Sequence, residues 1–318
     1  MKILANDGIS KSGINQLEKN GFNVITEKVE QENLVEYINK ENVQVILVRS
    51  ATQVRKDIID NCPSVKIIGR GGVGMDNIDV DYAKEKGLLV INTPAASSQS
   101  VAELVMAHLF NISRFIYDSN REMPENGENN FKALKKKYAK GTELRGKTLG
   151  IIGFGRIGQF TAKYALGAGM KIIAYDPFID KIDLNIEIAD QSISVNIDTV
   201  NLDNLLENAD YISLHVPMPK DGKALLSSTE FNKMKDGVKI VNAARGGVID
   251  EDDLITAIKN NKVSAAALDV FVGEPNPRTD LLSQKNISLT PHIGAATNEA
   301  QDRIGTELAD KIIAFYNQ

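Results

Sequence analysis

Short apolar runs alternate with amphipathic stretches along the first hundred residues of the chain. The apolar runs predict buried strands, and the stretches between them, with apolar residues at three- and four-residue spacing, predict helices. This alternation is typical of a parallel sheet flanked by helices. The expected strands are residues 2–5, 23–26, 43–48, 65–68 and 88–91, and the expected helices are residues 10–20, 33–40, 56–61 and 80–86.

The same alternation resumes at residue 148, so a second sheet is expected and the fold class is α/β with two doubly wound parallel-sheet domains. Between the two sheets, Ser97 and Ser98 are expected to cap a long apolar helix at 101–116. Two polar stretches predict less regular structure, namely a loop with one short helix at 118–147 and an extended connection at 181–200. The later strands are expected at 148–152, 171–175, 211–216, 239–242, 265–270 and 287–290, and a helix at 298–316.

A glycine motif, Gly-Phe-Gly-Arg-Ile-Gly at 153–158, directly follows one of these apolar runs. Gly153 would make the tight turn, Gly155 would let the backbone approach a pyrophosphate, and Gly158 would let the next helix pack on the strand. The N-terminus of that helix offers free amides and a partial positive charge. Asp176, at the end of the next apolar run, can accept hydrogen bonds from ribose hydroxyls, which favours NAD over NADP. A structural turn would explain the glycines alone, but strand, helix and acid in register predict a dinucleotide site.

Composition narrows the class of protein further. The chain has 318 residues, enough for two medium domains, and its net charge of −5 argues against general nucleic-acid binding. The single cysteine, Cys62, excludes an intrachain disulfide, and we expect it to be a buried structural residue in a reducing compartment. The N-terminus has too short an apolar stretch for a signal peptide, and no apolar run approaches a membrane span. We therefore expect a cytoplasmic protein that binds neither nucleic acid, membrane nor metal.

Three histidines are candidates for the base that hydride transfer to a nicotinamide requires. His108 falls inside the apolar helix, where a packed core histidine is the expectation. His215 follows a strand, which suggests cofactor contact or packing. His292 stands at a strand end between proline and glycine, where a catalytic group would be placed, and packing within the loop is the alternative.

Two acids and an arginine follow neighbouring strand ends. Glu274 could hydrogen-bond the imidazole of His292, and Asp269 could contact the nicotinamide or the histidine. Ordinary solvation of the loops is the alternative for both acids. Arg245, followed by two glycines, could bind a substrate carboxylate through its two-pronged guanidinium.

Taken together, these motifs resemble the D-isomer-specific 2-hydroxyacid dehydrogenase family, over almost the whole chain. N-terminal motifs at 48–52, 69–77 and 141–144 resemble the branch of that family that acts on 3-phospho-D-glycerate. The motifs that carry the family resemblance occur in the family's order: 153–158, Tyr175-Asp176-Pro177, His215-Val216-Pro217, 242–247, 267–271 with Glu274-Pro275, and 291–294.

The resemblance implies a flavodoxin-like substrate domain from residues 1–98 and 294–318, with a Rossmann NAD-binding domain, residues 99–293, inserted between them. It implies Arg245, Glu274 and His292 as the active-site triad. His292 would be the acid–base, Glu274 would pair with it, and Arg245 would bind the carboxylate and carbonyl. Family members are typically homodimers built through the cofactor domain.

Together with the glycine motif, the resemblance implies that residues from both parts of the chain hold the cofactor. The expected NAD contacts are Val73, Gly153, Gly155, Arg156, Ile157, Gly158, Asp176, His215, Val216, Pro217, Ala243, Ala244, Arg245, Asp269, His292, Gly294 and Ala295.

A phosphorylated substrate needs cations besides Arg245 and His292. Arg49 and Arg70 follow expected strands and are the candidates, unless they pair with Asp57 or Asp76. Gly72, Val73 and Gly74 complete the expected substrate-binding set. The lysines of residues 132–140 are either a solvated surface or a phosphate site reached across a dimer.

The resulting expectation is NAD-dependent oxidation of a small phosphorylated 2-hydroxy acid, 3-phospho-D-glycerate, to 3-phosphohydroxypyruvate. A glyoxylate or hydroxypyruvate reductase, another D-2-hydroxyacid dehydrogenase, and a redox-sensing binding protein of the corepressor type are the alternatives. The chain departs from the family in having no tryptophan and a longer connection at 181–200, and a C-terminal regulatory domain after residue 318 is not expected.

Overall fold

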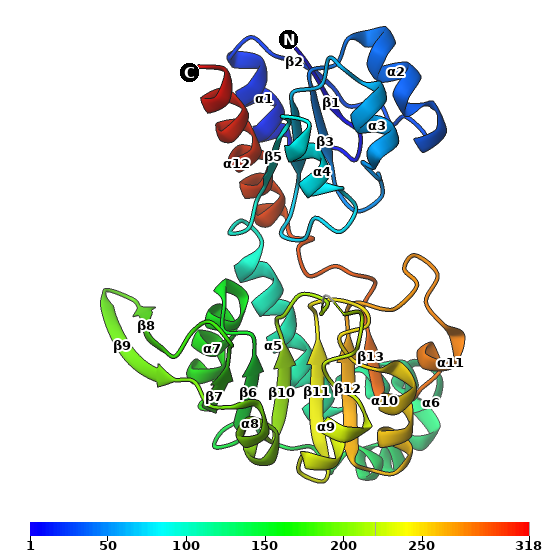
Figure 1. The fold of residues 1–318 in the computed structure, drawn as a ribbon. Helices are drawn as coiled ribbons and strands as arrows, with labels where there is room; N and C mark the ends of the chain where they lie inside the picture. The colour runs from blue at the N-terminus through cyan, green and yellow to red at the C-terminus, as the bar shows by residue number, and fades with distance from the viewer. Residues whose placement is uncertain (220, 318) are drawn as a thin grey trace. The chain divides into compact units, whose positions relative to one another are not determined.

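The computed structural model describes residues 1–219 and 221–317, and the chain divides into two compact units. Unit 1 comprises Met1–Ser100 and Ala295–Gln318, and unit 2 comprises Val101–Gly294. Each unit is built around a parallel sheet (Figure 1). The predicted α/β fold class with two doubly wound sheets is therefore confirmed.

The sheet of unit 1 has five strands in the order β2-β1-β3-β4-β5, all parallel. This is the flavodoxin-like order, in which the chain reverses direction across the sheet after β2 and so places helices on both faces. Because both faces are covered, the central strand β3 is apolar and buried at every position. The strands are β1 (Lys2–Ala5), β2 (Asn23–Ile25), β3 (Val45–Val48), β4 (Ile67–Arg70) and β5 (Leu89–Asn92).

The last helix of the chain packs against the first one. A Cβ on Gly13 of α1 would lie 2.8 Å from the carbonyl carbon of Gly305 in α12, so only glycine allows this close approach of the two helices. Ile304, Leu308 and Ile312 of α12 share a core with Leu17 of α1. The helices of unit 1 are α1 (Lys11–Lys19), the short 3-10 helix η1 (Gln31–Asn33), α2 (Leu34–Glu41), α3 (Lys56–Asn61), α4 (Val80–Glu85) and α12 (Asn298–Tyr316).

The sheet of unit 2 has six parallel strands in the order β13-β12-β11-β10-β6-β7. A parallel bridge between Ala174 and Thr199 extends it beyond β7. With that bridge as its third strand, the order is that of a Rossmann fold, and the chain reverses direction between β6 and β10. The strands are β6 (Thr148–Ile152), β7 (Lys171–Tyr175), β10 (Tyr211–Leu214), β11 (Val238–Asn242), β12 (Val263–Leu268) and β13 (Ile287–Leu289).

Two apolar cores cover the faces of this second sheet. Residues of α5 and α7 pack in one core, and residues of α8, α9 and α10 pack in the other. The helices of unit 2 include α5 (Ser98–Arg114, which begins in unit 1), α7 (Arg156–Gly167), α8 (Leu202–Asn208), α9 (Ser228–Lys233), α10 (Glu251–Lys259) and α11 (Thr279–Leu282).

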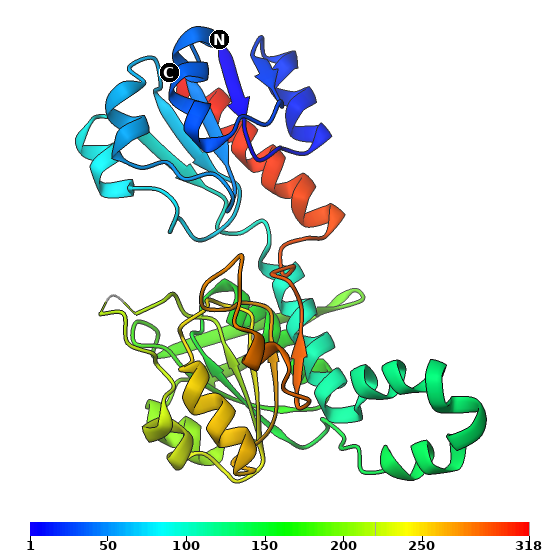
Figure 2. The same cartoon turned by 90° about the vertical axis from the view of Figure 1, so that its right-hand side faces the viewer.

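The expectation of a loop with one short helix at 118–147 is wrong. This segment contains most of α6 (Ile116–Lys137), a helix with non-helical backbone angles at Asn130. Figure 2 shows α6 as a bent arm that extends away from the sheet of unit 2. Of its residues only Leu134 is buried, so the arm lacks the apolar stripe by which an amphipathic helix is recognised in a sequence.

The expectation of an irregular connection at 181–200 is also wrong. β8 (Lys181–Ile188) and β9 (Gln191–Asp198) form an antiparallel hairpin where a Rossmann fold usually has a crossover helix. Leu184 and Ile197 on one face of the hairpin join the core of unit 2, and the other face is polar. The alternation of isoleucine or leucine with polar residues is the signal of a half-buried strand. The polar members of that alternation made the segment look irregular.

Candidate active site

The glycine motif forms the turn between β6 and α7. Gly153 has a φ of +92°, and a Cβ there would lie 2.6 Å from the carbonyl oxygen of His215. A Cβ on Gly158 would lie 2.3 Å from the carbonyl oxygen of Gly153, so this glycine lets α7 pack closely on β6. Gly155 is different, because a Cβ there would meet no described atom within 4 Å. The space beside Gly155 is open to a ligand.

The start of α7 has the chemistry of a pyrophosphate site. The helix has 12 residues, and its N-cap, Gly155, supplies no side chain to cap the first amides. Those amides and the helix dipole remain available to phosphate oxygens. His215, Val216 and Pro217 follow β10 and flank the turn, since Gly153 packs against His215 and Val216.

Asp176 is held at the end of β7 beside this turn. Its Oδ2 accepts a hydrogen bond from the amide of Phe154 at 2.8 Å, and its Oδ1 accepts one from the amide of Phe178 at 2.9 Å. A carboxylate fixed here can accept ribose hydroxyls and repels a 2′-phosphate. The residues present therefore fit NAD.

Arg245, Glu274 and His292 lie in loops that follow β11, β12 and β13. These three strands are neighbours in the sheet, so their carboxyl ends meet at one edge (Figure 1). A Cβ on Gly246 would lie 2.0 Å from the carbonyl oxygen of Phe271. The loop that carries Arg245 consequently packs tightly on the loop that leads to Glu274.

Glu274 and His292 form a hydrogen-bonded pair. Nδ1 of His292 lies 2.7 Å from Oε2 of Glu274, whose Oε1 accepts the amide of Phe271 at 2.8 Å. Burial alone would raise the pKa of Glu274, but these hydrogen bonds and the charges of His292 and Arg245 lower it below its usual range. An ionised Glu274 favours a proton on Nδ1, which leaves Nε2 of His292 free to exchange a proton with a substrate.

The Arg245 loop is fixed by a buried asparagine. Nδ2 of Asn242 donates to the carbonyl oxygen of Arg245 at 2.9 Å, and its Oδ1 accepts the amide of Ala244 at 3.0 Å. Nη1 of Arg245 donates to the carbonyl oxygen of Ala244 at 2.6 Å. Asn242 was not singled out from the sequence, although a polar residue at the end of an otherwise apolar strand was an available signal.

The backbone at His292 is in the left-handed region, with a φ of +55°. A residue other than glycine is strained there and needs its neighbours to hold it. Asp269, which is 1% exposed, does so by accepting the amide of Ile293 on Oδ1 and that of Gly294 on Oδ2, both at 2.8 Å. The sequence suggested Asp269 as a contact of the nicotinamide or of the histidine, and the structure shows it holding the backbone after His292.

In unit 1, Arg49 and Arg70 lie at the carboxyl ends of the adjacent strands β3 and β4. Burial lowers the pKa of the Arg49 guanidinium, and the charge of Asp7 opposes this effect. Among the described residues, that guanidinium has no hydrogen bond or ion pair. Nη1 of Arg70 donates to the carbonyl oxygen of Gly71 at 3.2 Å, and a Cβ on Gly72 would lie 1.6 Å from the same nitrogen. Two cations therefore lie beside the loop that includes Val73 and Gly74.

The other titratable candidates are either buried in a core or exposed at the surface. His108 is 3% exposed inside unit 2. Burial lowers the pKa of His215 to about 3, so its ring is neutral, and Nε2 lies 2.9 Å from Oγ of Ser213. Cys62 is buried, and burial raises its pKa to about 11, which makes the thiol unreactive. The lysines at 132, 135, 136, 137 and 140 are exposed on or just after α6, and Lys137 pairs with Glu122.

Membrane-spanning helices and metal-binding clusters are both absent from the part of the chain that the structure describes. Over residues 1–219 and 221–317, none of the helices has the length and apolar character needed to cross a bilayer. The same residues contain no group of three or more His, Cys, Asp or Glu side chains that could hold a metal ion.

Comparison with known sequences identifies relatives along the whole chain. Residues 106–294 match the family described as D-isomer specific 2-hydroxyacid dehydrogenase, NAD binding domain. The chain is 46% identical to the hydroxypyruvate reductase of Thermotoga maritima, over 98% of this chain and 97% of that protein. It is 41% identical to the D-3-phosphoglycerate dehydrogenase of Archaeoglobus fulgidus, over 98% of this chain but only 57% of that protein. The chain thus spans little more than half of that phosphoglycerate dehydrogenase.

Solved structures of similar fold cover the whole chain. The TT0316 protein of Thermus thermophilus superposes with a TM-score of 0.85 at 26% identity, over 100% of this chain and 97% of that one. The NAD+-bound 3-phosphoglycerate dehydrogenase of Entamoeba histolytica superposes with a TM-score of 0.79 at 28% identity, over 100% of this chain and 96% of that one.

Proposed function

The chain belongs to the D-isomer-specific 2-hydroxyacid dehydrogenases, and within that family of NAD-dependent enzymes we propose that it oxidises 3-phospho-D-glycerate to 3-phosphohydroxypyruvate, a step of L-serine biosynthesis. The observation that carries this substrate is the pair of cations, Arg49 and Arg70, at adjacent strand ends of unit 1. A phosphate dianion is the natural partner of two neighbouring guanidinium groups. A substrate without phosphate has no need of both.

In the proposed reaction each member of the triad has a separate task. Nε2 of His292 takes the proton of the C2 hydroxyl as the C2–H bond releases a hydride and the C2=O bond forms. NAD, held at the glycine turn and Asp176, would supply the acceptor for that hydride when bound. Glu274, hydrogen-bonded to Nδ1, stabilises the imidazolium that results. Arg245 binds the C1 carboxylate and polarises the developing carbonyl.

A second candidate is the reduction of hydroxypyruvate or glyoxylate. It is favoured by the relative from Thermotoga maritima, which is named a hydroxypyruvate reductase and is matched over 97% of its length. The same triad would serve this reaction, with His292 donating a proton instead of accepting one.

Steady-state kinetics with NADH distinguish the two candidates. We expect the wild type to have a higher kcat/KM for phosphohydroxypyruvate than for hydroxypyruvate, glyoxylate or pyruvate. Arg70→Ala should lower kcat/KM about 10- to 100-fold for phosphohydroxypyruvate, the range for a lost charge-assisted hydrogen bond, and much less for hydroxypyruvate. Arg55→Ala, which removes an arginine paired with Asp79 in the same unit, is the control. A wild type that turns over hydroxypyruvate or glyoxylate far more efficiently than phosphohydroxypyruvate would show the second candidate to be right.

We also propose that unit 1 is the substrate domain, that unit 2 is the NAD-binding domain, and that the enzyme is a cytoplasmic homodimer joined through unit 2. The dimer is supported by the exposed apolar residues of α6, where Ile116, Met123 and Phe131 are 49%, 43% and 57% exposed. Apolar side chains gathered on a projecting arm are typical of an interface. Light scattering after size exclusion should give twice the chain mass of 34.8 kDa. Met123→Lys with Phe131→Lys should give a monomer, and a monomeric wild type would contradict the proposal.

A further inference from the structure

A row of buried and partly buried hydrogen bonds connects α5 with the end of β13 in unit 2. Nδ2 of Asn111 donates to Oγ of Ser288 at 2.7 Å, and Oγ of Ser288 lies 3.4 Å from Nδ1 of His108. Nε2 of His108 lies 3.1 Å from Oγ1 of Thr290, which donates to Oδ1 of Asp269 at 2.6 Å. His108 and Asn111 are three residues apart on one helix face, and Ser288 and Thr290 alternate along one strand face. The helical spacing and the strand alternation therefore explain why these side chains lie in one row.

The number of protons that each group carries fixes which atom donates and which accepts in each hydrogen bond of this row. Thr290 has one hydroxyl proton and gives it to Asp269, so Thr290 must accept from Nε2–H of His108. Burial lowers the pKa of His108, although the charge of Asp269 opposes this, so the ring is neutral and its Nδ1 is an acceptor. Ser288 then donates to His108 and accepts from Asn111. All donors point the same way, toward Asp269.

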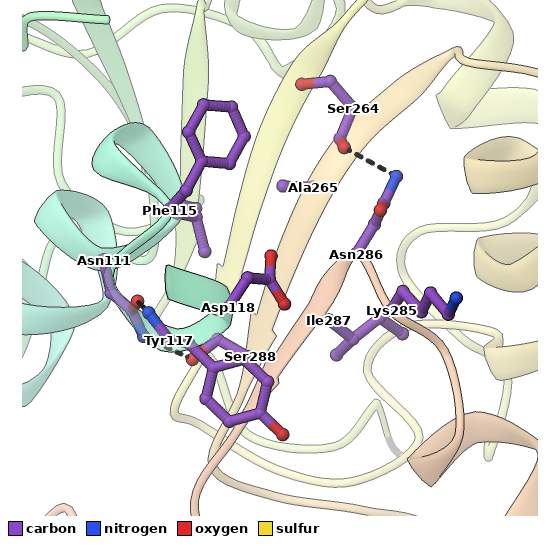
Figure 3. A pocket seen from close by; sticks show the side chains of 11 residues that line it. Asn111, Phe115, Tyr117, Asp118, Ser264, Ala265, Lys285, Asn286, Ile287 and Ser288 are labelled. Carbon is purple, nitrogen blue, oxygen red and sulfur yellow. Dashed lines mark hydrogen bonds between the residues drawn. The ribbon is translucent and has the colours of Figure 1, made fainter. Parts of the chain in front are cut away.

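The row runs from the amino ends of β12 and β13 to the carboxyl end of β12. At the far end, Oδ1 of Asn111 accepts the amide of Tyr117 at 2.7 Å, in the first turn of α6. Asn111, Tyr117 and Ser288 line a cavity of about 100 Å³ there (Figure 3). At the near end, Asp269 accepts the amides of Ile293 and Gly294, directly after the strained backbone of His292.

We propose that His108 is a positioning residue for the dehydrogenase reaction. Through Thr290 it orients the carboxylate of Asp269, and Asp269 holds the backbone that presents Nε2 of His292 to the substrate. The inference rests on the proposed function, because it takes His292 as the acid–base. If His108 only satisfied its own polar atoms within the core, its loss would affect stability and leave the His292 loop unchanged.

The first test is a double-substitution cycle measured by steady-state kinetics. Thr290→Val keeps the shape of the side chain and removes its hydroxyl, and His108→Leu removes the donor behind it. We expect each to lower kcat about 10-fold, with KM for the substrate changed less than about threefold. Because both break one row, the double variant should lose no more than Thr290→Val alone. If the double variant instead lost kcat by the product of the two single losses, the two residues would act independently, which would contradict a shared row.

His108→Gln is the conservative variant. Its amide nitrogen can donate to Thr290 and its amide oxygen can accept from Ser288, as the two ring nitrogens do. We expect kcat within about threefold of the wild type, since both hydrogen bonds are kept. Ser113→Ala is the matched control, because Ser113 is a buried polar residue of the same helix whose hydroxyl bonds lie outside the row. It should lower stability without lowering kcat, and a loss of kcat equal to that of Thr290→Val would overturn the inference.

A second readout does not depend on the identity of the substrate. Hydrogen–deuterium exchange of the amides of Ile293 and Gly294 should be about 10-fold faster in Thr290→Val, His108→Leu and the double variant, and unchanged in Ser113→Ala. Unchanged exchange in Thr290→Val would overturn the positioning role, whatever the enzyme acts on. If exchange is faster in these variants but the wild type does not turn over phosphohydroxypyruvate, the result would support the row and contradict only the proposed substrate.

Discussion

The two units share a parallel, doubly wound architecture but differ in the residues at the carboxyl ends of their strands. In unit 2 these ends lead to a glycine turn, the carboxylate of Asp176, and the three side chains Arg245, Glu274 and His292. In unit 1 the corresponding edge carries Arg49, Arg70 and a glycine-containing loop. The same kind of sheet edge therefore carries different residues in the two units, and under the proposed function the loops of unit 2 carry out the chemistry while those of unit 1 select the substrate.

The largest expected effect is on the chemical step in unit 2. His292→Ala should lower kcat by about 10²- to 10⁴-fold, the range for loss of a general acid–base, because it removes the imidazole that Glu274 orients through Nδ1. The affinity for NADH, measured by fluorescence titration, should stay within about threefold, since the glycine turn is untouched. If NADH binding were lost instead, His292 would be a cofactor residue and its edge would not be the catalytic one.

The second largest effect concerns the cofactor. Gly155→Val adds a side chain where the protein itself has no atoms within 4 Å, so the melting temperature should change little. The same side chain would occupy the expected place of the pyrophosphate, and the Kd for NADH should rise at least about 10-fold. Gly167→Val is the control, because a Cβ there also meets nothing within 4 Å but the residue lies at the end of α7. Equal NADH affinity in both variants would place the cofactor elsewhere.

These expectations rest on site residues that the sequence alone could indicate. The glycine motif, Asp176 and the triad all stand at strand ends, and an apolar run followed by a polar residue marks such an end without knowledge of the fold. The sequence therefore predicts the two sheets and the residues at their edges. NAD as cofactor was predicted from the glycine motif with Asp176, and membership of the dehydrogenase family from the resemblance of several motifs, and both are confirmed.

One missed feature depends on a contact between distant positions. His108 and Thr290 are 182 residues apart in sequence, and only the packing of α5 on β13 brings them together. The two other missed features are local: the arm α6 has too little buried surface to show an apolar stripe, and the polar residues that alternate with apolar ones in β8 and β9 made that segment look irregular. Periodicity reports which face of an element is buried, but not which element covers it.

A smaller expected effect is that the stability of unit 2 depends on pH near neutrality, because all three histidines lie in that unit. His215 has a pKa of about 3 in the folded protein and about 6.5 when unfolded, so only the unfolded state gains a proton between these values. Its stabilising contribution is complete above pH 6.5 and is lost as pH falls toward 3. Denaturant unfolding should show unit 2 losing up to about 2 kcal/mol between pH 7 and pH 5.

His215→Gln tests the origin of this pH dependence. The variant should be less stable at pH 7 but should lose less stability on acidification, because one of the two buried histidines that take up a proton on unfolding is gone and only His108 remains. The carboxyl of Glu274 has a pKa lowered from its ordinary value of 4.5, so its contribution is lost as pH falls below about 4.5, which is outside the interval from pH 7 to pH 5. An identical pH slope in His215→Gln and wild type would show that another group controls acid stability.

The proposal that unit 1 selects the substrate and unit 2 carries out the chemistry is tested most directly by the substrate selectivity of Arg49→Gln. The quantity is the ratio of kcat/KM for phosphohydroxypyruvate to that for hydroxypyruvate, measured beside the Kd for NADH, with Arg55→Gln as control. Our account predicts a ratio that falls about 10-fold or more, because a phosphate contact is lost, with NADH affinity unchanged. A ratio that stays the same, or a loss of activity shared equally by both substrates, would contradict the claim that unit 1 selects the substrate for the chemistry of unit 2.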